Sequence, residues 1–353
     1  MAALDPGFWR GKRVLLTGHT GFKGCWAAIW LSRLGAEATG LALAPDQQPS
    51  LFELAGVEAL VRSRIVDLRD PAAVEAALVG ESFDLVLHMA AQPIVRTAIE
   101  QPVDTFATNV MGTVNLLQAL RAQASLKAVL VVTSDKVYAN DGGGRAFAED
   151  DALGGKDPYS ASKAATEIAA RSFAQSYFEP ANVPVATARG GNVIGGGDFS
   201  RDRIVADIVR AARRQEPVVL RHPQATRPWQ HVLDCVAGYL VYLQALATEP
   251  ATPRAMHFGP RRGGASVTVG ELASLGVEAL GARPWRHEPD ERSLEAQSLA
   301  IDAGLARRVL GFASRLDAPA AVALAMDWYR RQANGEDALA LCREEIAAYE
   351  GAA

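Results

Sequence analysis

The segment VLLTGHTGFKG, residues 14–24, joins a short aliphatic run to a glycine-rich turn. The aliphatic run predicts a buried β-strand, and the residues after the turn predict a helix that ends near Gly35. Glycines at such a turn let the backbone bend tightly and let a pyrophosphate approach the free N–H groups of the helix. The spacing is GxxGxxG rather than GxGxxG, so the motif alone fits a plain strand–helix turn equally well. Its place at the head of a long strand–helix series favours a dinucleotide site.

The chain up to about residue 190 alternates short aliphatic runs with helical segments, which is typical of a parallel sheet covered on both faces. Helices are expected after the N-cap Asp70 with Pro71 at the first helical position, and over residues 104–122 and 160–177. We therefore expect an α/β fold with a doubly wound parallel sheet of the Rossmann type. Its predicted strands are residues 13–17, 37–43, 64–67, 84–90, 128–133 and 183–189.

The pattern changes at the glycine-rich segment GGNVIGGGD, residues 190–198. A helix over 202–214 and a short strand over 217–221 follow it. A chain of 353 residues exceeds one ordinary core. We expect an NAD-binding domain over residues 1–190 and a smaller substrate-binding lobe over 191–353, with the option that the chain crosses back to the first domain.

Composition excludes several classes of protein. With 49% hydrophobic and 22% charged residues, the chain is not disordered along its length. Its net charge of −4 is spread over both halves, which argues against a nucleic-acid partner. No apolar stretch reaches the roughly 20 residues of a membrane span, and no signal peptide is visible, so we expect a cytoplasmic protein without a membrane partner. Cys25, Cys235 and Cys342 are too far apart in the sequence to indicate a clustered metal site.

A second motif, YSASK at residues 159–163, places Tyr159 and Lys163 one helical turn apart. A phenol has a pKa near 10, so a tyrosine that acts as a base near pH 7 needs its phenolate stabilised by about 4 kcal/mol. A neighbouring ammonium and a cationic nicotinamide both supply such stabilisation. Alone, the motif is more typical of surface residues on a helix, but behind a glycine loop it predicts a catalytic pair.

These motifs and three further segments resemble the extended short-chain dehydrogenase/reductase family, and within it the nucleotide-sugar 4,6-dehydratases. The further segments are HMAAQP (88–93), NVMGT (109–113) and RPWQHV (227–232). More narrowly, TGHTGFKG (17–24), TSDKVY (133–138) and GNVIGGGD (191–198) resemble the dehydratases that act on CDP-glucose. The resemblance covers nearly the whole chain. It implies an NAD-dependent lyase with CDP-glucose as the expected substrate, in a deoxysugar pathway such as that of lipopolysaccharide.

The resemblance implies a mechanism with five catalytic residues, which include Lys163. Tyr159 removes the proton of the sugar 4-hydroxyl beside Ser134 while NAD⁺ accepts the C4 hydride, and the ketone then acidifies the C5 hydrogen. We assign Asp135 as the acid that protonates the departing 6-hydroxyl, and Lys136, which stands where relatives carry Glu, as the base at C5. A free lysine amine has a pKa of about 10.4, so this base must be neutral near pH 7. The alternative, that Lys136 positions water or substrate, stays open.

The resemblance also implies which residues bind the dinucleotide. Residues 41–46, at the end of the second strand, contain no Arg or Lys for a 2′-phosphate, which favours NAD, while Lys23 keeps NADP open as an alternative. Asp67 fits a turn cap as well as an adenine contact, and Asn109 fits a structural helix residue as well as a cofactor residue. The full set is Gly18, Thr20, Gly21, Phe22, Lys23, Gly24, Asp67, Leu68, Ala90, Ala91, Gln92, Asn109, Tyr159, Lys163 and Arg189.

On the substrate side, Ser134 is expected to contact the sugar, and Asn192 and Arg227 match positions that hold the diphosphate in relatives. Arg203 is a second phosphate candidate, although a single arginine on a helix is more often a surface charge. His88 and His231 lack partners at ligand spacing, so both are expected to be structural and no metal is expected.

Two alternatives and an oligomeric state complete the expectations. A nucleotide-sugar 4-epimerase or reductase needs the Tyr–Lys pair alone, and a non-catalytic NAD(P)-sensing protein would need neither residue. The Asp135–Lys136 dipeptide favours dehydration. Relatives commonly dimerise through two helices of the first domain, including the helix with the Tyr–Lys pair, so we expect a homodimer or a higher homo-oligomer.

Overall fold

A seven-stranded parallel sheet forms the centre of the computed structural model, which describes residues 4–140, 142–260, 267–289 and 299–351. The strand order is β10-β6-β5-β4-β1-β2-β3, and every neighbouring pair is parallel. The order reverses between β1 and β4, which is the point where doubly wound sheets bind ligands. The expected fold class is confirmed. The strands are β1 (Arg13–Thr17), β2 (Glu37–Ala42), β3 (Arg62–Ile65), β4 (Leu85–His88), β5 (Ala128–Val132), β6 (Val185–Gly190) and β10 (Ala255–Phe258).

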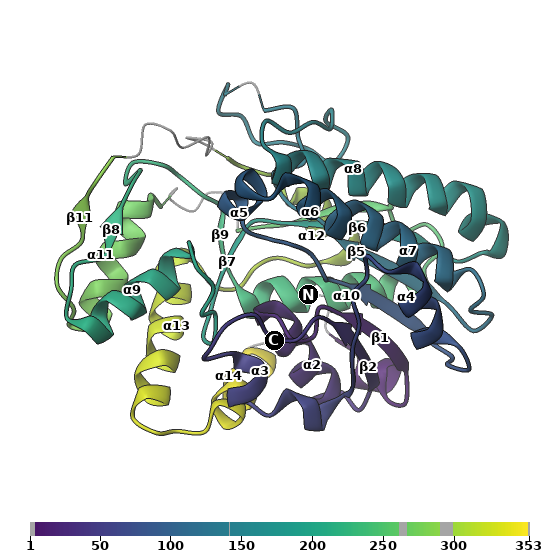
Figure 1. Cartoon of the computed structure of the whole chain (residues 1–353), viewed down its shortest axis with the longest axis horizontal. Helices are drawn as coiled ribbons and strands as arrows, with labels where there is room; N and C mark the ends of the chain where they lie inside the picture. The colour runs from purple at the N-terminus through teal and green to yellow at the C-terminus, as the bar shows by residue number, and fades with distance from the viewer. Residues whose placement is uncertain (1–3, 141, 261–266, 290–298, 352–353) are drawn as a thin grey trace.

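Helices cover both faces of this sheet (Figure 1). Two small two-stranded sheets, β7 (Asn192–Ile194) with β9 (Trp229–His231) and β8 (Val219–Leu220) with β11 (Arg286–His287), lie in the later part of the chain. No helix within the described ranges has both the length and the apolar character to cross a membrane. The α-helices are α1 (Pro6–Trp9), α2 (Phe22–Arg33), α3 (Leu51–Leu54), α4 (Pro71–Leu78), α5 (Val95–Glu100), α6 (Pro102–Phe106), α7 (Gly112–Leu120), α8 (Pro158–Phe173), α9 (Ile204–Arg214), α10 (Val232–Thr248), α11 (Val269–Ala279), α12 (Gly304–Leu310), α13 (Ala318–Ala333) and α14 (Ala338–Gly351).

Capping residues fix the helices that matter for the site. Asp70 accepts hydrogen bonds from the N–H groups of the first turn of α4, as the sequence predicts. Asp157 caps α8 through the N–H of Ser160, so α8 begins at Pro158, two residues before the predicted start. This cap places Tyr159 in the first turn of α8, at the carboxyl edge of the sheet.

Two predicted helices contain π-helical turns that the sequence did not indicate. The expected helix over 104–122 consists of α6, a π segment (Ala107–Met111) and α7. The helix α8 likewise continues as a π segment (Ala174–Phe178). Such turns release a backbone carbonyl from its usual partner and occur often at functional sites.

The sheet separates two apolar cores. Alternate residues of β1 point to opposite faces, so Leu15 packs with α4 and α7 while Val14 and Leu16 pack with α2 and α10. The helix α10 is buried along most of its length. Because β10 follows α10 and pairs with β6, the chain beyond residue 190 completes the large sheet. The division of the chain at residue 190 stays a prediction.

Candidate active site

The glycine loop between β1 and α2 has a shape that only glycine permits at two positions. Gly18 has a φ of +77°, and a Cβ there would lie 2.8 Å from the nitrogen of Ala90. A Cβ on Gly24 would lie 1.9 Å from the carbonyl oxygen of Gly18. Gly21 forms the N-cap of α2, and no side chain caps this helix. The N–H groups at the start of α2 are therefore available to an anion, which fits the pyrophosphate of a dinucleotide.

Three further residues predicted to bind the cofactor, Thr20, Asp67 and Leu68, have protein contacts of their own. The hydroxyl of Thr20 donates to the carbonyl oxygen of Leu43 at 2.8 Å and ties the loop to the end of β2. Asp67 accepts the guanidinium of Arg69 at 2.7 Å and also its backbone N–H, and Arg69 holds the pKa of this carboxyl below its usual range. The structure therefore gives Asp67 the role of a turn cap, and its contact with adenine stays a prediction. Leu68, also a cofactor candidate, is buried beside Gly112.

Asn109 connects the loop after β4 to α8. Its Oδ1 accepts the N–H of Gln92 at 2.8 Å, and its Nδ2 donates to Ser162 Oγ at 2.8 Å. Its backbone carbonyl, which lies in the π segment, accepts the hydroxyl of Thr166 on α8 at 2.9 Å. These contacts agree with the structural interpretation of Asn109, because they fix the position of the helix that carries the Tyr–Lys pair. Ala90 and Ala91 lie in the same loop.

Tyr159 and Lys163 are both buried on α8, with 8% and 5% of their surface exposed. The ammonium of Lys163 donates to the carbonyl oxygen of Val132 at 3.1 Å. Burial, assisted by the charge of Lys23 in the glycine loop, lowers the pKa of Lys163 to about 7. Burial raises the pKa of Tyr159, while a hydrogen bond to Ser134 and the charge of Arg203 oppose this rise. Tyr159 therefore needs additional positive charge nearby before it can accept a proton at neutral pH.

The three residues after β5 form a compact polar cluster. Ser134 Oγ donates to Asp135 Oδ1 at 2.9 Å, and Lys136 Nζ lies 3.0 Å from the same oxygen. Asp135 is fully buried, and within the described ranges its Oδ2 has no hydrogen-bond partner. An unpartnered buried oxygen is costly unless a ligand or a proton satisfies it. This oxygen can therefore face a substrate hydroxyl.

Lys136 sits in an ion pair, which bears on its predicted role. Its Nζ contacts Asp135 and also donates to Asn192 Oδ1 at 3.2 Å. The amine is therefore held between two protein oxygens from different segments. This geometry fits the alternative that Lys136 positions a ligand, and its role as the C5 base stays a prediction.

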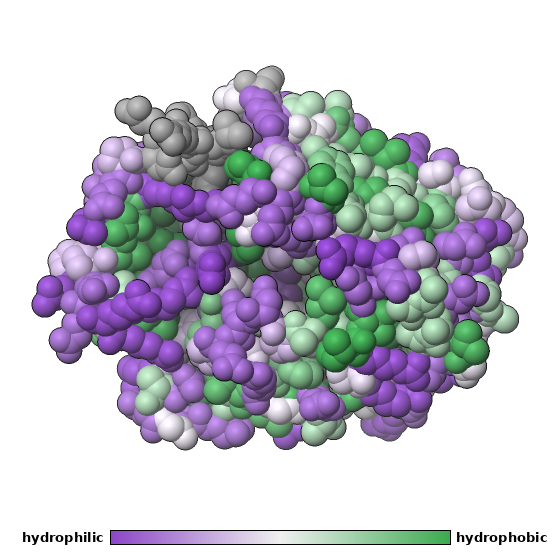
Figure 2. Space-filling model, viewed as in Figure 1, coloured by the Kyte–Doolittle hydropathy of each residue, from purple (hydrophilic) through white to green (hydrophobic). Residues whose placement is uncertain are grey.

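Of the substrate-side candidates, Asn192 contacts the cluster directly, through Lys136. Asn192 lies on β7, which pairs with β9 just after Arg227. A Cβ on Gly191 would lie 2.5 Å from the carbonyl oxygen of Pro228, so glycine lets these two segments approach. Arg203, the N-cap residue of α9, donates to the carbonyl oxygen of Pro93 at 3.1 Å and so reaches the loop after β4. Figure 2 shows the surface hollowed near the middle of this face.

Arg189 is engaged in a buried network that the sequence analysis did not foresee. Its guanidinium donates to both carboxylate oxygens of Glu167, at 2.9 and 2.8 Å, and to the hydroxyl of Tyr138 at 2.5 Å. The structure gives Arg189 the role of joining β6 to α8, and its predicted contact with the cofactor stays a prediction. Glu167 lies four residues after Lys163, and this helical spacing is the signal that could have revealed it.

The two histidines of the motifs have protein partners in the core. His88 contacts the hydroxyls of Thr17 at 2.6 Å and Thr113 at 2.9 Å, and His231 accepts the N–H of Leu233 at the start of α10. Burial lowers the pKa of both histidines to about 3. Both rings are therefore neutral at physiological pH. In the part of the chain that the structure describes, no three His, Cys, Asp or Glu side chains are grouped as metal ligands.

Phe22 and Lys23, at the start of α2, lie close to two segments from the second half of the chain. Phe22 lies beside Gly195, where a Cβ would come within 3.2 Å of its ring. The ammonium of Lys23 lies 5.8 Å from the centre of the Tyr239 ring on α10. The loop is thus in contact with the segment GGNVIGGGD and with α10.

Comparison with known proteins agrees with this geometry. The model of the NAD dependent epimerase/dehydratase family matches residues 14–255, and the chain belongs to this family. The CDP-glucose 4,6-dehydratase of Salmonella typhimurium is 40% identical over 353 residues, which cover 98% of each chain. The dTDP-glucose 4,6-dehydratase of Streptomyces griseus is 29% identical over 70% of this chain and 72% of its own length. The structure of the UDP-glucose 4-epimerase of Thermus thermophilus in complex with NAD has a TM-score of 0.77 at 26% identity and covers 90% of this chain and 99% of its own.

Proposed function

We propose that this chain is a CDP-glucose 4,6-dehydratase that converts CDP-D-glucose to CDP-4-keto-6-deoxy-D-glucose and water with NAD as a resident cofactor. The observation that carries the proposal is Asp135, whose buried Oδ2 has no hydrogen-bond partner within the described ranges and whose charge acts on Tyr159. An epimerase or a reductase needs no acid at this position, whereas loss of water does. The 40% identity with a CDP-glucose 4,6-dehydratase over nearly the whole chain supports the same substrate.

The residues present fit a dinucleotide. The glycine loop and the uncapped N-terminus of α2 would hold the pyrophosphate, and Lys163 would hold the nicotinamide ribose. When bound, NAD supplies a hydride acceptor at sugar C4 and a hydride donor at C6. The region after β2 offers no Arg or Lys to a 2′-phosphate, which supports NAD over NADP.

The first chemical task of the chain is to remove a proton from the 4-hydroxyl. Tyr159 accepts this proton, and Ser134 orients the hydroxyl beside it. Because burial raises the pKa of Tyr159, this step depends on the positive charges of Arg203, Lys163 and the oxidised cofactor. Loss of the C4 hydride and of this proton leaves a ketone.

The second task is to expel water across C5 and C6. The ketone acidifies the C5 hydrogen, which a base removes as the C6–O bond breaks and a C5–C6 double bond forms. For this step Asp135 must carry a proton on its carboxyl group; it donates that proton to the departing hydroxyl, so that water leaves and a carboxylate remains. Hydride returned to C6 and a solvent proton at C5 complete the product. Lys136 either removes the C5 proton or orients the sugar through its contacts with Asp135 and Asn192.

On the substrate side, Asn192, Arg203 and Arg227 are proposed to hold the diphosphate. Guanidinium groups bind phosphate oxygens in a bidentate manner; Asn192 contacts Lys136, Arg203 reaches the loop after β4, and Arg227 precedes β9, which pairs with the strand that carries Asn192. Placement in a deoxysugar pathway such as that of lipopolysaccharide rests on the nature of the product and stays a prediction.

A turnover screen with CDP-, dTDP-, GDP- and UDP-glucose tests the proposed substrate. We expect CDP-glucose to be converted at the highest kcat/KM, to a 4-keto-6-deoxy product detected by its absorbance at alkaline pH, without net formation of NADH. A higher kcat/KM with the dTDP-, GDP- or UDP-sugar would contradict the assignment of cytosine as the nucleobase of the substrate. A 4-epimer as product identifies an epimerase, and stoichiometric NADH identifies a simple dehydrogenase.

We further propose that the chain forms a homodimer through α6, the π segment after it, and α8. An apolar groove of about 510 Å³ lies along Pro102, Val103, Phe106 and Met111. Val103 is 79% exposed and Ile168 on the contacting helix α8 is 61% exposed, and Figure 2 shows apolar surface over the region of α8. Large apolar side chains exposed in one area indicate an interaction surface. A second copy of the chain can cover this face with the same residues.

A further inference from the structure

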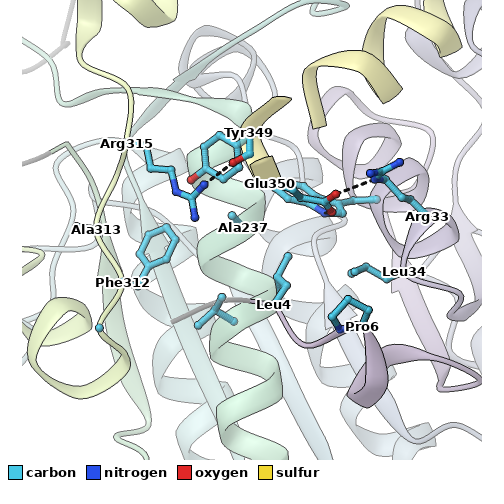
Figure 3. Close-up of a pocket in the computed structure, with 13 residues that line it drawn as sticks. Leu4, Pro6, Arg33, Leu34, Ala237, Phe312, Ala313, Arg315, Tyr349 and Glu350 are labelled. Carbon is cyan, nitrogen blue, oxygen red and sulfur yellow. Dashed lines mark hydrogen bonds and ion pairs between the residues drawn. The ribbon is translucent and has the colours of Figure 1, made fainter. Parts of the chain in front are cut away.

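A cavity of about 420 Å³ lies on the far side of α10 from the catalytic residues. This volume is within the range of small-molecule sites, which are mostly apolar with a few placed polar groups. The walls fit that description (Figure 3), and they combine the N-terminal segment, α10 and the loop after α12. The apolar lining includes Leu4, Pro6, Leu34, Ala237, Val241 and Phe312.

The helix α10 separates this cavity from the active site. A Cβ on Gly190, at the end of β6, would lie 2.5 Å from the hydroxyl of Tyr239, so Tyr239 faces the sheet and the site. Ala237 and Val241 are each two positions away from Tyr239, which turns them by about 200° around the helix. These two residues line the cavity. A ligand in the cavity would therefore not touch a ligand in the active site.

Arg315 is a cation at the cavity that has no acidic side chain as a direct partner within the described ranges. Its guanidinium lies 4.5 Å from the centre of the Tyr349 ring and donates to the backbone carbonyl of Tyr349. In the part of the chain that the structure describes, it forms no ion pair. The nearby carboxylate of Asp234 instead accepts the backbone N–H groups of Arg315 and Leu316 and the hydroxyl of Tyr349.

The other two charged residues of the lining, Arg33 and Glu350, form an ion pair with each other. Arg33 Nε lies 2.8 Å from Glu350 Oε2, and Trp30 donates to Glu350 Oε1 at 2.9 Å. Figure 3 shows this pair on one side of the cavity and Arg315 with Phe312 on the other. Among the described residues, the cavity thus offers one guanidinium that forms no ion pair and a surrounding apolar surface, while the nearby carboxylate of Asp234 is occupied by other donors.

We propose that this cavity binds a small amphipathic anion, with one singly charged group on a flat aromatic or short aliphatic body. The anionic group would accept hydrogen bonds from Arg315, which binds carboxylates and sulfonates through its planar donors. The body would pack against Phe312, Val241 and Leu4. A diphosphate is a poorer match, because one guanidinium would face at least two negative charges. The inference does not depend on the proposed dehydratase activity.

The test uses 8-anilinonaphthalene-1-sulfonate, whose fluorescence rises in an apolar environment, with the full chain in the presence of excess CDP and NAD. We expect one saturable site that neither nucleotide displaces. Ala237→Leu fills the cavity from α10 and Arg315→Gln removes the charge, so each should weaken binding at least tenfold. Arg343→Gln removes an exposed arginine from α14 and should leave binding unchanged.

Several results would overturn the proposal. Displacement of the probe by CDP or NAD places it in the active site, and unsaturable binding means that no defined site exists. Equal affinity in the wild type and in both cavity variants shows that the probe binds elsewhere, for instance at the apolar groove along α6. Circular dichroism checks that each variant is folded. If Arg315→Gln is not folded, Ala313→Leu, which fills the cavity from the loop after α12, replaces it with the same expected loss of binding.

Discussion

Asp135 is the residue on which the choice between water loss and simple redox chemistry depends. One of its oxygens accepts hydrogen bonds from Ser134 and Lys136, while the other has no partner in the described ranges. A general acid must direct its proton toward the substrate, and we propose the oxygen without a protein partner for this role. The contacts of Oδ1 with Ser134 and Lys136 fix the orientation of the carboxyl group.

The role of Lys136 can be separated from that of the Tyr–Lys pair by Lys136→Ala. We expect the variant to oxidise C4 but to lose water about 10² to 10⁴ times more slowly, because acid–base assistance of this size is lost. Single-turnover measurements should then show reduced cofactor accumulating on the enzyme. Lys127→Ala, which removes an exposed lysine at the start of β5, is the control. Unchanged turnover of CDP-glucose in Lys136→Ala removes Lys136 from the mechanism.

Glu345 on α14 gives a second prediction at the residue scale. Burial, together with the charge of Asp327, raises the pKa of this carboxyl to about 8, so its folded-state value is above that of the unfolded chain. Its contribution to stability is therefore complete below about pH 4.5 and is lost as the pH rises toward 8. Glu345→Gln should be more stable than the wild type at pH 8 by about 4 kcal/mol, with little difference at pH 4.5.

Chemical denaturation across this pH range measures the difference in the free energy of unfolding. Glu344→Gln is the matched control on the adjacent residue, whose pKa is lowered by Arg331, so this change should bring no gain at pH 8. Parallel stability profiles for the wild type and Glu345→Gln would show that Glu345 does not titrate as proposed.

Among the elements, the junction of β1 and α2 determines the shape of the proposed cofactor site. The helix approaches the strand so closely that a Cβ on Gly24 would overlap the carbonyl of Gly18, while a Cβ on Gly21 would be 3.4 Å from its nearest atom. Gly21 also has an ordinary φ of −82°. The two glycines therefore serve different purposes, one in packing and the other in access to the helix N-terminus.

Two alanine substitutions distinguish these purposes. Gly24→Ala should lower the free energy of unfolding by at least about 2 kcal/mol, because the helix must move away from the strand. Gly21→Ala should keep the melting temperature of the wild type but weaken NAD binding, because its methyl group stands where the pyrophosphate approaches. Thermal melting and NAD titration measure both effects. Equal melting temperatures for the two variants would contradict this division of roles.

Elements with local signals could be predicted from the sequence. Asp70 and Asp157 cap α4 and α8 through their own side chains, and β1, β4, β5 and β6 are apparent as short aliphatic runs. The strand β3 (Arg62–Ile65) has one aliphatic side chain and begins two residues before the predicted strand over 64–67. The strand β10 has four residues and is stabilised by pairing with β6, which no local pattern shows. The π segment at Asn109 depends on the contact of its carbonyl with Thr166, a residue that is also distant in the sequence.

The same distinction holds for the site. Two parts of the site could be predicted because each is a short motif with a known geometry. These are the glycine loop with Gly18 and the pair Tyr159 and Lys163, one helical turn apart. The Arg189–Glu167 pair and the Lys136–Asn192 contact form between elements that meet only in the folded chain. The sequence therefore gives no sign that Arg189 has a partner in the core, and its predicted contact with the cofactor lacks that information.

At the scale of the whole molecule, the exposed apolar face of α6 and α8 predicts the oligomeric state. Val103→Lys and Ile168→Lys each place a charge in the proposed interface and should convert a dimer to a monomer, because two like charges would meet across the two-fold axis. Light scattering after size-exclusion chromatography measures the mass. Val79→Lys, at an exposed apolar position after α4, should remain dimeric. A wild-type chain that is monomeric at all concentrations would contradict the proposed interface.

The central claim is that one hydride leaves C4 and returns to C6 of the same sugar after water is lost. Conversion of CDP-glucose in deuterium oxide tests it most directly, with the product analysed by NMR. We predict one solvent-derived deuterium at C5, none at C6 and no net NADH. A product with protium at C5, or release of NADH in proportion to sugar consumed, would contradict the account.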